Sequence, residues 1–168
     1  MRQIILLATL IFAVQSLARS QTNIDYNHHD SLATPRCIGG QLSAKHESED
    51  AGAGQRFITY SFKNHSALPC TLSNFPGFVL LNHAGQRMPG QSITHNSDSV
   101  TVVTLAPGGK AFFTIHYSSC STGGTPPCRF SSKVQIKAPH TKRAFVPRER
   151  LDPFQLSVDL SPVKSTAP

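Results

Sequence analysis

From residue 37 onward the chain is divided into short runs in which apolar and polar residues alternate. A period of two places every second side chain on one face, which is typical of a half-buried β-strand. No window of eleven residues has the periodicity of an amphipathic helix. The alternating apolar positions are Ile58, Tyr60 and Phe62; Ala111, Phe113, Ile115 and Tyr117; Phe130, Val134, Ile136 and Ala138; and Leu156, Val158 and Leu160. Two further apolar runs cover residues 78–81 and 100–105, and the pattern as a whole indicates strands.

Clusters of Gly, Pro, Asn and Ser separate these runs at spacings of roughly 8–12 residues. This arrangement predicts an all-β fold, an antiparallel β-sandwich of seven to eight strands. Residues 107–109 (Pro-Gly-Gly) form a predicted turn and not a phosphate cradle, because no helix follows them. Residues 75–77 (Phe-Pro-Gly) predict a tight corner, and residues 47–50 a polar loop. Asn64 begins an N-x-S sequon, which predicts a surface loop.

The first 18 residues have the pattern of a secretory signal peptide. A positive start at Arg2 precedes an apolar run over residues 4–14. Small side chains at Ser16 and Ala18 fit cleavage after Ala18, and cleavage after Ser20 is the alternative. The apolar run is too short for a membrane span, which needs about 20 residues. The sequence therefore predicts a secreted or periplasmic protein without a membrane span.

The length of 168 residues and the 39% share of hydrophobic residues suit one domain with a packed core. Residues 19–36 are polar and have no periodicity, so we expect a disordered leader there. Residues 37–161 contain the alternating runs and form the predicted β-sandwich domain, and residues 162–168 form a C-terminal tail.

Four cysteines, an even number, favour disulfide bonds in an oxidising compartment. Three pairings are possible, and we favour the one that joins sequence neighbours, Cys37–Cys70 and Cys120–Cys128. No C-x-x-C motif occurs, and no histidine flanks either pair at ligand spacing. The cysteines therefore indicate structural disulfides, and neither a metal site nor a redox pair.

Two stretches together resemble a known family. The first carries the patterns F-x-N-x-S, C-x-L and F-P-G-x-V-x-L between Phe62 and Leu81, and the second carries V-x-L-A-P-G-G-x-A over residues 103–111. They are similar to the bacterial exported family named domain of unknown function 4232. The resemblance covers about residues 37–161 and implies an immunoglobulin-like β-sandwich, a place in the bacterial cell envelope and a Cys37–Cys70 disulfide. It implies no activity and no cofactor.

A basic segment is the sharpest functional feature of the sequence. It has seven Lys and Arg residues between Arg129 and Arg150, with Glu149 as the only acid, in a chain of net charge +7. The candidate anion-binding residues in it are Arg129, Lys133, Lys137, Lys142 and Arg143. Strand alternation places the first three in one outward row, and the last two lie near the next hairpin tip. Such a face attracts anionic polymers or phospholipid headgroups; alternatively, its charges only solvate the strand and discourage edge-to-edge pairing.

Other site chemistries find little support in the sequence. Acidic residues number only nine, no G-x-S-x-G motif occurs, and no carboxylate pair is placed on a rigid cleft, so we expect no enzyme, catalytic residue or cofactor. The eight histidines are scattered, whereas a metal needs three or four preorganised ligands, so no metal ligands are assigned. Nucleic-acid binding is not expected from an exported chain without a run of surface aromatics.

The sequence thus predicts a non-catalytic module of the cell envelope whose partner is an anionic envelope polymer or another envelope protein. A ligand-free structural or accessory envelope domain is the first alternative. A His-mediated metal-binding protein is the second alternative.

Overall fold

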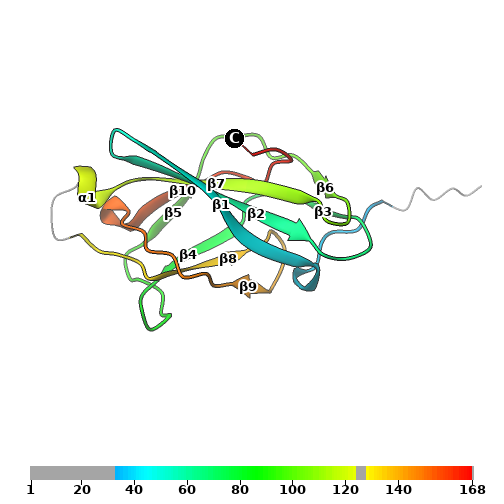
Figure 1. Ribbon diagram of the computed structural model, residues 1–168, viewed down its shortest axis with the longest axis horizontal. Coiled ribbons are helices and arrows are strands. Elements are labelled where there is room, and N and C mark those ends of the chain that lie inside the picture. Colours follow the sequence, from blue (N-terminus) through cyan, green and yellow to red (C-terminus); the bar gives the residue numbers. More distant parts are fainter. Residues whose placement is uncertain (1–32, 124–127, 168) are drawn as a thin grey trace, which may run out of the picture. The chain divides into compact units, whose positions relative to one another are not determined.

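The structure, a computed structural model, describes residues 33–123 and 128–167, and ten strands lie within them (Figure 1). The strands are β1 (Leu42–Gly52), β2 (Gln55–Asn64), β3 (Cys70–Leu72), β4 (Gly77–Leu81), β5 (Ser92–His95), β6 (Val103–Leu105), β7 (Lys110–Ser118), β8 (Lys133–Lys137), β9 (Ala144–Phe145) and β10 (Ser157–Leu160). One helical turn, α1 (Cys120–Gly123), and two 3₁₀ turns, Gly39–Gln41 and Phe154–Leu156, complete these elements. The fold is therefore all-β, as predicted. The expected signal peptide and most of the expected leader lie outside the described residues.

The strands form three sheets, with the orders β1-β2-β7-β10-β5, β4-β8-β9 and β3-β6. β10 pairs with β5 in parallel, from Ser157 opposite Ser92 to Leu160 opposite His95. The other described strand pairs are antiparallel. The prediction of a purely antiparallel arrangement is therefore wrong at β5. Alternation shows which side chains share a face, but it does not show the direction of the neighbouring strand.

The polar loop predicted at residues 47–50 is instead part of β1, an edge strand paired with β2 along its length. Most side chains of β1 are exposed or half-buried, so backbone pairing and not apolar burial identifies this strand. Ala53 and Gly54 adopt φ angles of 49° and 78° in the turn between the two strands, the positive values that a tight hairpin turn requires. Like β1, the short strands β3, β5 and β9 match none of the alternating or apolar runs, and with them the count is ten and not the predicted seven to eight.

Aromatic side chains of two sheets meet in the core. The rings of Tyr60 and Phe62 on β2 stack on Phe113 of β7, with centroid distances of 5.4 and 5.3 Å. Phe78 of β4 lies 6.4 Å from Tyr60, and Phe145 of β9 lies 6.3 Å from Phe62. The inner face of the five-stranded sheet therefore packs against the three-stranded sheet, and the apolar positions of the alternating runs on β2, β7 and β8 are buried between them.

Three apolar residues at the ends of predicted strands lie outside the ladders. Val100 is exposed, and the strand predicted over residues 100–105 begins only at Val103. Phe130 precedes β8 and is 39% exposed, so it is not on the buried face where alternation places it. Leu156 is buried but belongs to the 3₁₀ turn before β10. Alternation does not mark the residue at which backbone pairing stops.

The folded domain extends beyond residues 37–161 at both ends. The carbonyl of Pro35 accepts a hydrogen bond of 2.8 Å from the N–H of Thr71, so the last residues of the expected leader are part of the fold. In the expected tail, Val163 has no exposed surface, and Lys164 exchanges two backbone hydrogen bonds of 2.8 Å with Phe112. The domain therefore runs at least from Pro35 to Lys164.

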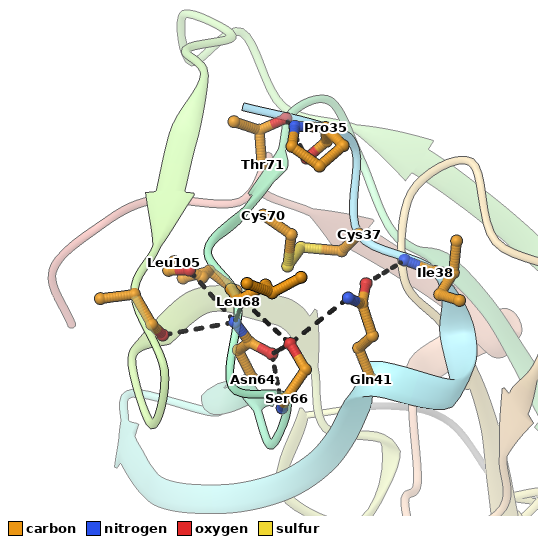
Figure 2. The surroundings of a disulfide bond; sticks show 11 residues. Pro35, Cys37, Ile38, Gln41, Asn64, Ser66, Leu68, Cys70, Thr71 and Leu105 are labelled. Carbon is orange, nitrogen blue, oxygen red and sulfur yellow. Dashed lines mark hydrogen bonds between the residues drawn. A yellow bond between two sulfur atoms is a disulfide. The ribbon is translucent and has the colours of Figure 1, made fainter. Parts of the chain in front are cut away.

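Both predicted disulfides are present, with Cα–Cα distances of 4.8 Å for Cys37–Cys70 and 5.7 Å for Cys120–Cys128. The first joins the start of the domain to β3 (Figure 2). The second closes a short loop that follows β7. The pairing of sequence neighbours is thus confirmed.

Asn64, beside the first disulfide, is fully buried (Figure 2). Its side-chain amide donates to the carbonyls of Leu68 at 2.9 Å and Leu105 at 3.2 Å. Its Oδ1 accepts hydrogen bonds from the backbone N–H of Ser66 at 2.9 Å and the hydroxyl of Ser66 at 2.8 Å. The sequon prediction of a surface position is therefore wrong, because this amide satisfies backbone groups inside the domain and connects the end of β2 to β6.

Candidate anion-binding surface

Strand β8 carries two of the predicted anion-binding residues on its outer face. Val134 and Ile136 have no exposed surface because they pack in the core, whereas Lys133 and Lys137 are only half-buried. Since successive side chains of a strand point to opposite faces, both lysines point away from the core. They are separated by two strand periods, a distance of about 13 Å along β8.

The chain after β9 continues alongside β8 in the opposite direction. Two backbone hydrogen bonds of 3.2 Å join the two segments beyond β9, one from Val134 to Pro147 and one from Glu149 to Ser132. These bonds lie on either side of Lys133 and Arg148, so they place the two residues opposite each other. Arg148 is exposed, as is Arg150 two residues later. Alternation therefore puts both arginines on the same outer face as the lysines of β8.

The other three predicted residues lie near the two ends of β8. Arg129 precedes the strand, and its Nη1 donates to the carbonyl of Pro89 at 3.0 Å. Lys142 and Arg143 lie in the connection between β8 and β9, and both are exposed. The Arg143 guanidinium carbon is 5.6 Å from the centre of the Phe145 ring, within the range of a cation–π contact. Lys133 and Lys137 thus lie on the outer face of β8, and the other three predicted residues lie near its two ends.

Arg87 joins this surface from a separate part of the sequence. It forms an isolated antiparallel bridge with Leu81, which is the partner of Lys133 in the pairing of β4 with β8. The order across the sheet is therefore Arg87, Leu81, Lys133 and Arg148. Arg87 is exposed. No sequence pattern marks this arginine, because only the pairing of β4 with β8 brings it next to the basic segment.

We call these eight residues the basic strip: Arg87, Arg129, Lys133, Lys137, Lys142, Arg143, Arg148 and Arg150. None of the ion pairs found in residues 33–123 and 128–167 involves a member of the strip. Glu149, the one acid in the basic segment, faces the other way, and its Oε1 lies 3.1 Å from Nδ1 of His46 on β1. Cations of one sign without acidic partners create a positive potential that attracts anions.

The histidines considered as metal ligands have separate local partners. Nε2 of His65 lies 2.5 Å from the hydroxyl of Ser43, and the His95 ring stacks on Phe75 at 4.0 Å. Among the side chains that the structure describes, no group of three or more His, Cys, Asp or Glu is placed to hold a metal ion. The described helices include none that is long and apolar enough to cross a membrane.

Comparison with known proteins gives a family match and a weak structural likeness. The family described as a domain of unknown function (DUF4232) matches residues 37–165, in agreement with the resemblance seen in the sequence. No curated protein matches the chain. A selenomethionine-labelled β-glucosidase from Kluyveromyces marxianus aligns with 12% identity and a TM-score of 0.28, over 67% of this chain and 15% of the enzyme's length. A likeness this weak carries no argument about fold or activity.

Proposed function

The chain belongs to the family described as a domain of unknown function (DUF4232), and from this premise we propose that it is an exported, non-catalytic module. Its role is to bind an anionic polymer of the bacterial cell envelope, and the basic strip is the binding surface. The observation that supports this most strongly is the row formed by Arg87, Lys133 and Arg148, which crosses the sheet. Among the described residues, none of the three has an acidic partner.

Coulomb attraction supplies the binding energy. An exposed Lys or Arg near an anionic surface contributes about 1 kcal/mol at physiological salt. If all eight residues of the strip engaged the polymer, they would contribute about 8 kcal/mol, which corresponds to a Kd of about 1 µM. Five of the eight residues of the strip are arginines, and a guanidinium can bond two oxygens of one phosphate at once. A phosphate-bearing polymer therefore suits the strip best.

Export and fold class fit the same role. Two disulfides support an oxidising location, because such bonds persist outside the cytosol. The two packed layers of mainly antiparallel strands support an immunoglobulin-like sandwich, with the parallel β5–β10 pair as a departure from that pattern. In this arrangement Lys133 and Lys137, on the outer face of β8, are half-buried, so part of each side chain is open to a partner.

The test is binding of the disulfide-bonded chain to purified poly(glycerol phosphate), with neutral dextran as the uncharged polymer. In the strip variant, Lys133→Gln, Lys137→Gln and Arg148→Gln are combined. Removing three contributions of about 1 kcal/mol each is expected to weaken binding about 100-fold. Dextran should bind neither the wild-type chain nor the strip variant.

A matched control removes the same charge elsewhere. Arg36, Lys45 and Lys63 are exposed and lie outside the strip, so a variant with Gln at all three has the same net charge as the strip variant. Its affinity should stay close to that of the wild-type chain. Equal losses in the two variants would mean that net charge and not the strip governs binding. A wild-type chain that does not bind the polymer would favour a ligand-free accessory domain.

A further inference from the structure

A row of acidic and aromatic side chains crosses the outer face of the five-stranded sheet, on the side away from the core. Strand register places Asp50 of β1 opposite Phe57 of β2, Phe57 opposite His116 of β7, and His116 opposite Asp159 of β10. Thr94 of β5 continues the row. With adjacent strands about 4.8 Å apart, the backbones of Asp50 and Asp159 lie roughly 14 Å from each other, with Phe57 and His116 between them.

The two rings form a fixed ridge. Phe57 and His116 stack with their centroids 4.5 Å apart and their planes at 17°. One hydrogen bond positions the imidazole, since its Nε2 lies 2.8 Å from Oε1 of Gln55, and its Nδ1 lies 3.9 Å from Oδ2 of Asp159. One face of the Phe57 ring is covered by this stack. The side chain is nevertheless 43% exposed, so an apolar surface of the ring remains open toward β1.

A hollow lies on each side of the ridge. The one on the β1 side has a volume of about 360 Å³ and is lined by Ser48, Asp50, Phe57, Thr59 and Thr114. It therefore combines the open ring face with the exposed carboxylate of Asp50 and the exposed hydroxyl of Ser48. The hydroxyls of Thr59 and Thr114 lie 3.3 Å apart and bond to each other. The hollow on the other side has a volume of about 280 Å³, and its lining includes Phe57, His116 and Asp159. Asp98 and Lys164 also line it and form an ion pair, with Oδ2 of Asp98 2.8 Å from Nζ of Lys164.

This combination of groups selects among ligand classes. Neither Asp50 nor Asp159 has a Lys or Arg partner among the described residues. Their carboxylates disfavour an anionic ligand, so this face does not share the partner of the basic strip. A polyamine would satisfy the two carboxylates but would leave the exposed hydroxyl of Ser48, beside Phe57, without a role. A sugar ring has a flat C–H face that packs on an aromatic ring, and its hydroxyls donate to carboxylates and exchange hydrogen bonds with Ser and Thr.

We propose that this face is a second binding site, and that its ligand is a neutral oligosaccharide. One sugar ring stacks on the open face of Phe57, and its hydroxyls bond to the exposed side chains of Asp50 and Ser48. The glycan chain then passes over the ridge toward Asp159. The module would thus hold an uncharged glycan on one sheet and an anionic polymer on the other.

The experiment is calorimetric titration of the disulfide-bonded chain with cellohexaose, maltohexaose and chitohexaose, and separately with spermine. At least one of the three sugars should bind with a Kd of about 1 mM or tighter. Phe57→Ala should weaken that binding about tenfold or more, because the stacking surface is lost. Asp50→Asn should weaken it less, since the amide oxygen still accepts a hydrogen bond.

Two controls separate this site from other effects. Phe130→Ala removes another exposed aromatic ring, from the side of the basic strip, and should leave sugar binding unchanged. The strip variant described above should also bind the sugar normally, so that failure of one proposal does not imply failure of the other. The proposal is overturned if none of the three sugars binds, if only spermine binds, or if Phe57→Ala folds normally and binds as the wild-type chain does.

Discussion

Oε1 of Glu149 lies 3.1 Å from Nδ1 of His46. This contact ties the segment that carries Arg148 and Arg150 to strand β1, which is distant in the sequence. It also turns the single acid of the basic segment away from the basic strip, because residue 149 faces inward where residues 148 and 150 face outward. The uniform sign of the strip is therefore a consequence of strand alternation and not of composition alone.

Tyr60 lies in the same region, with its ring 5.5 Å from that of His46. Its hydroxyl is buried and has no hydrogen-bond partner among the described residues, and burial raises the pKa of Tyr60 far above its ordinary value. Tyr60→Phe removes an unsatisfied polar group and keeps the ring, so the free energy of unfolding in urea should rise by about 1 kcal/mol. A clear loss of stability would show that the hydroxyl has a partner in solution.

Asn64 was predicted to lie in a surface loop, but its side chain is buried inside the domain. Asn64→Ala leaves the carbonyls of Leu68 and Leu105 and the N–H of Ser66 without this partner, so we expect a loss of about 3 kcal/mol in the free energy of unfolding. Asn82→Ala, in a surface turn, is the matched control and should cost less than about 1 kcal/mol. Similar small losses in both variants would contradict the role of Asn64 inside the domain.

The two disulfides should contribute unequally. The Cys37–Cys70 loop spans 33 positions and the Cys120–Cys128 loop spans 8. Chain-entropy estimates give about 3.7 kcal/mol for the first and about 2.5 kcal/mol for the second. Replacing each pair with alanine and measuring thermal unfolding should therefore show the larger loss for Cys37 and Cys70. The opposite order would mean that native contacts near Cys120 outweigh loop closure.

Much of the fold could be predicted from the sequence because its central strands are amphipathic. Ile58, Tyr60 and Phe62 are buried on one face, as the period of two predicts. β1 could not be predicted from the sequence, since an edge strand with exposed side chains has no apolar pattern. The parallel pairing of β10 with β5 could not be predicted either, because strand direction depends on the path of the intervening chain.

The basic strip could be predicted only in part. Lys133 and Lys137 were placed correctly on an outer face because their strand is short, regular and half-buried. Arg87 could not be found, since it reaches the strip through the pairing of Leu81 with Lys133. Phe57 could not be assigned to a site for the same reason, because its neighbours in the row come from three other strands.

Asp152 should make stability depend on pH. Desolvation raises the pKa of its carboxyl, but hydrogen bonds from Ser121 and Ser119 outweigh it, and the pKa lies below its ordinary value. The folded state therefore binds this proton less readily than the unfolded state, whose pKa is about 3.9. The stability it contributes is present above that value and is lost as the pH falls through the lower folded pKa.

Asp152→Asn removes this titration. The difference in unfolding free energy between the wild-type chain and the variant should be constant above about pH 5 and should shrink below about pH 4. Urea unfolding at a series of pH values measures it. Parallel pH profiles for the two proteins would show that the carboxylate makes no such contribution.

Binding to poly(glycerol phosphate) across a range of NaCl concentrations tests the role of the basic strip most directly. The logarithm of the wild-type association constant should fall linearly with the logarithm of the salt concentration, as polyanion binding by cations requires. The variant with Lys133→Gln, Lys137→Gln and Arg148→Gln should bind more weakly and have a slope smaller by about 2 to 3. Equal slopes for the wild-type chain, this variant and the control variant at Arg36, Lys45 and Lys63 would contradict anion binding by the strip.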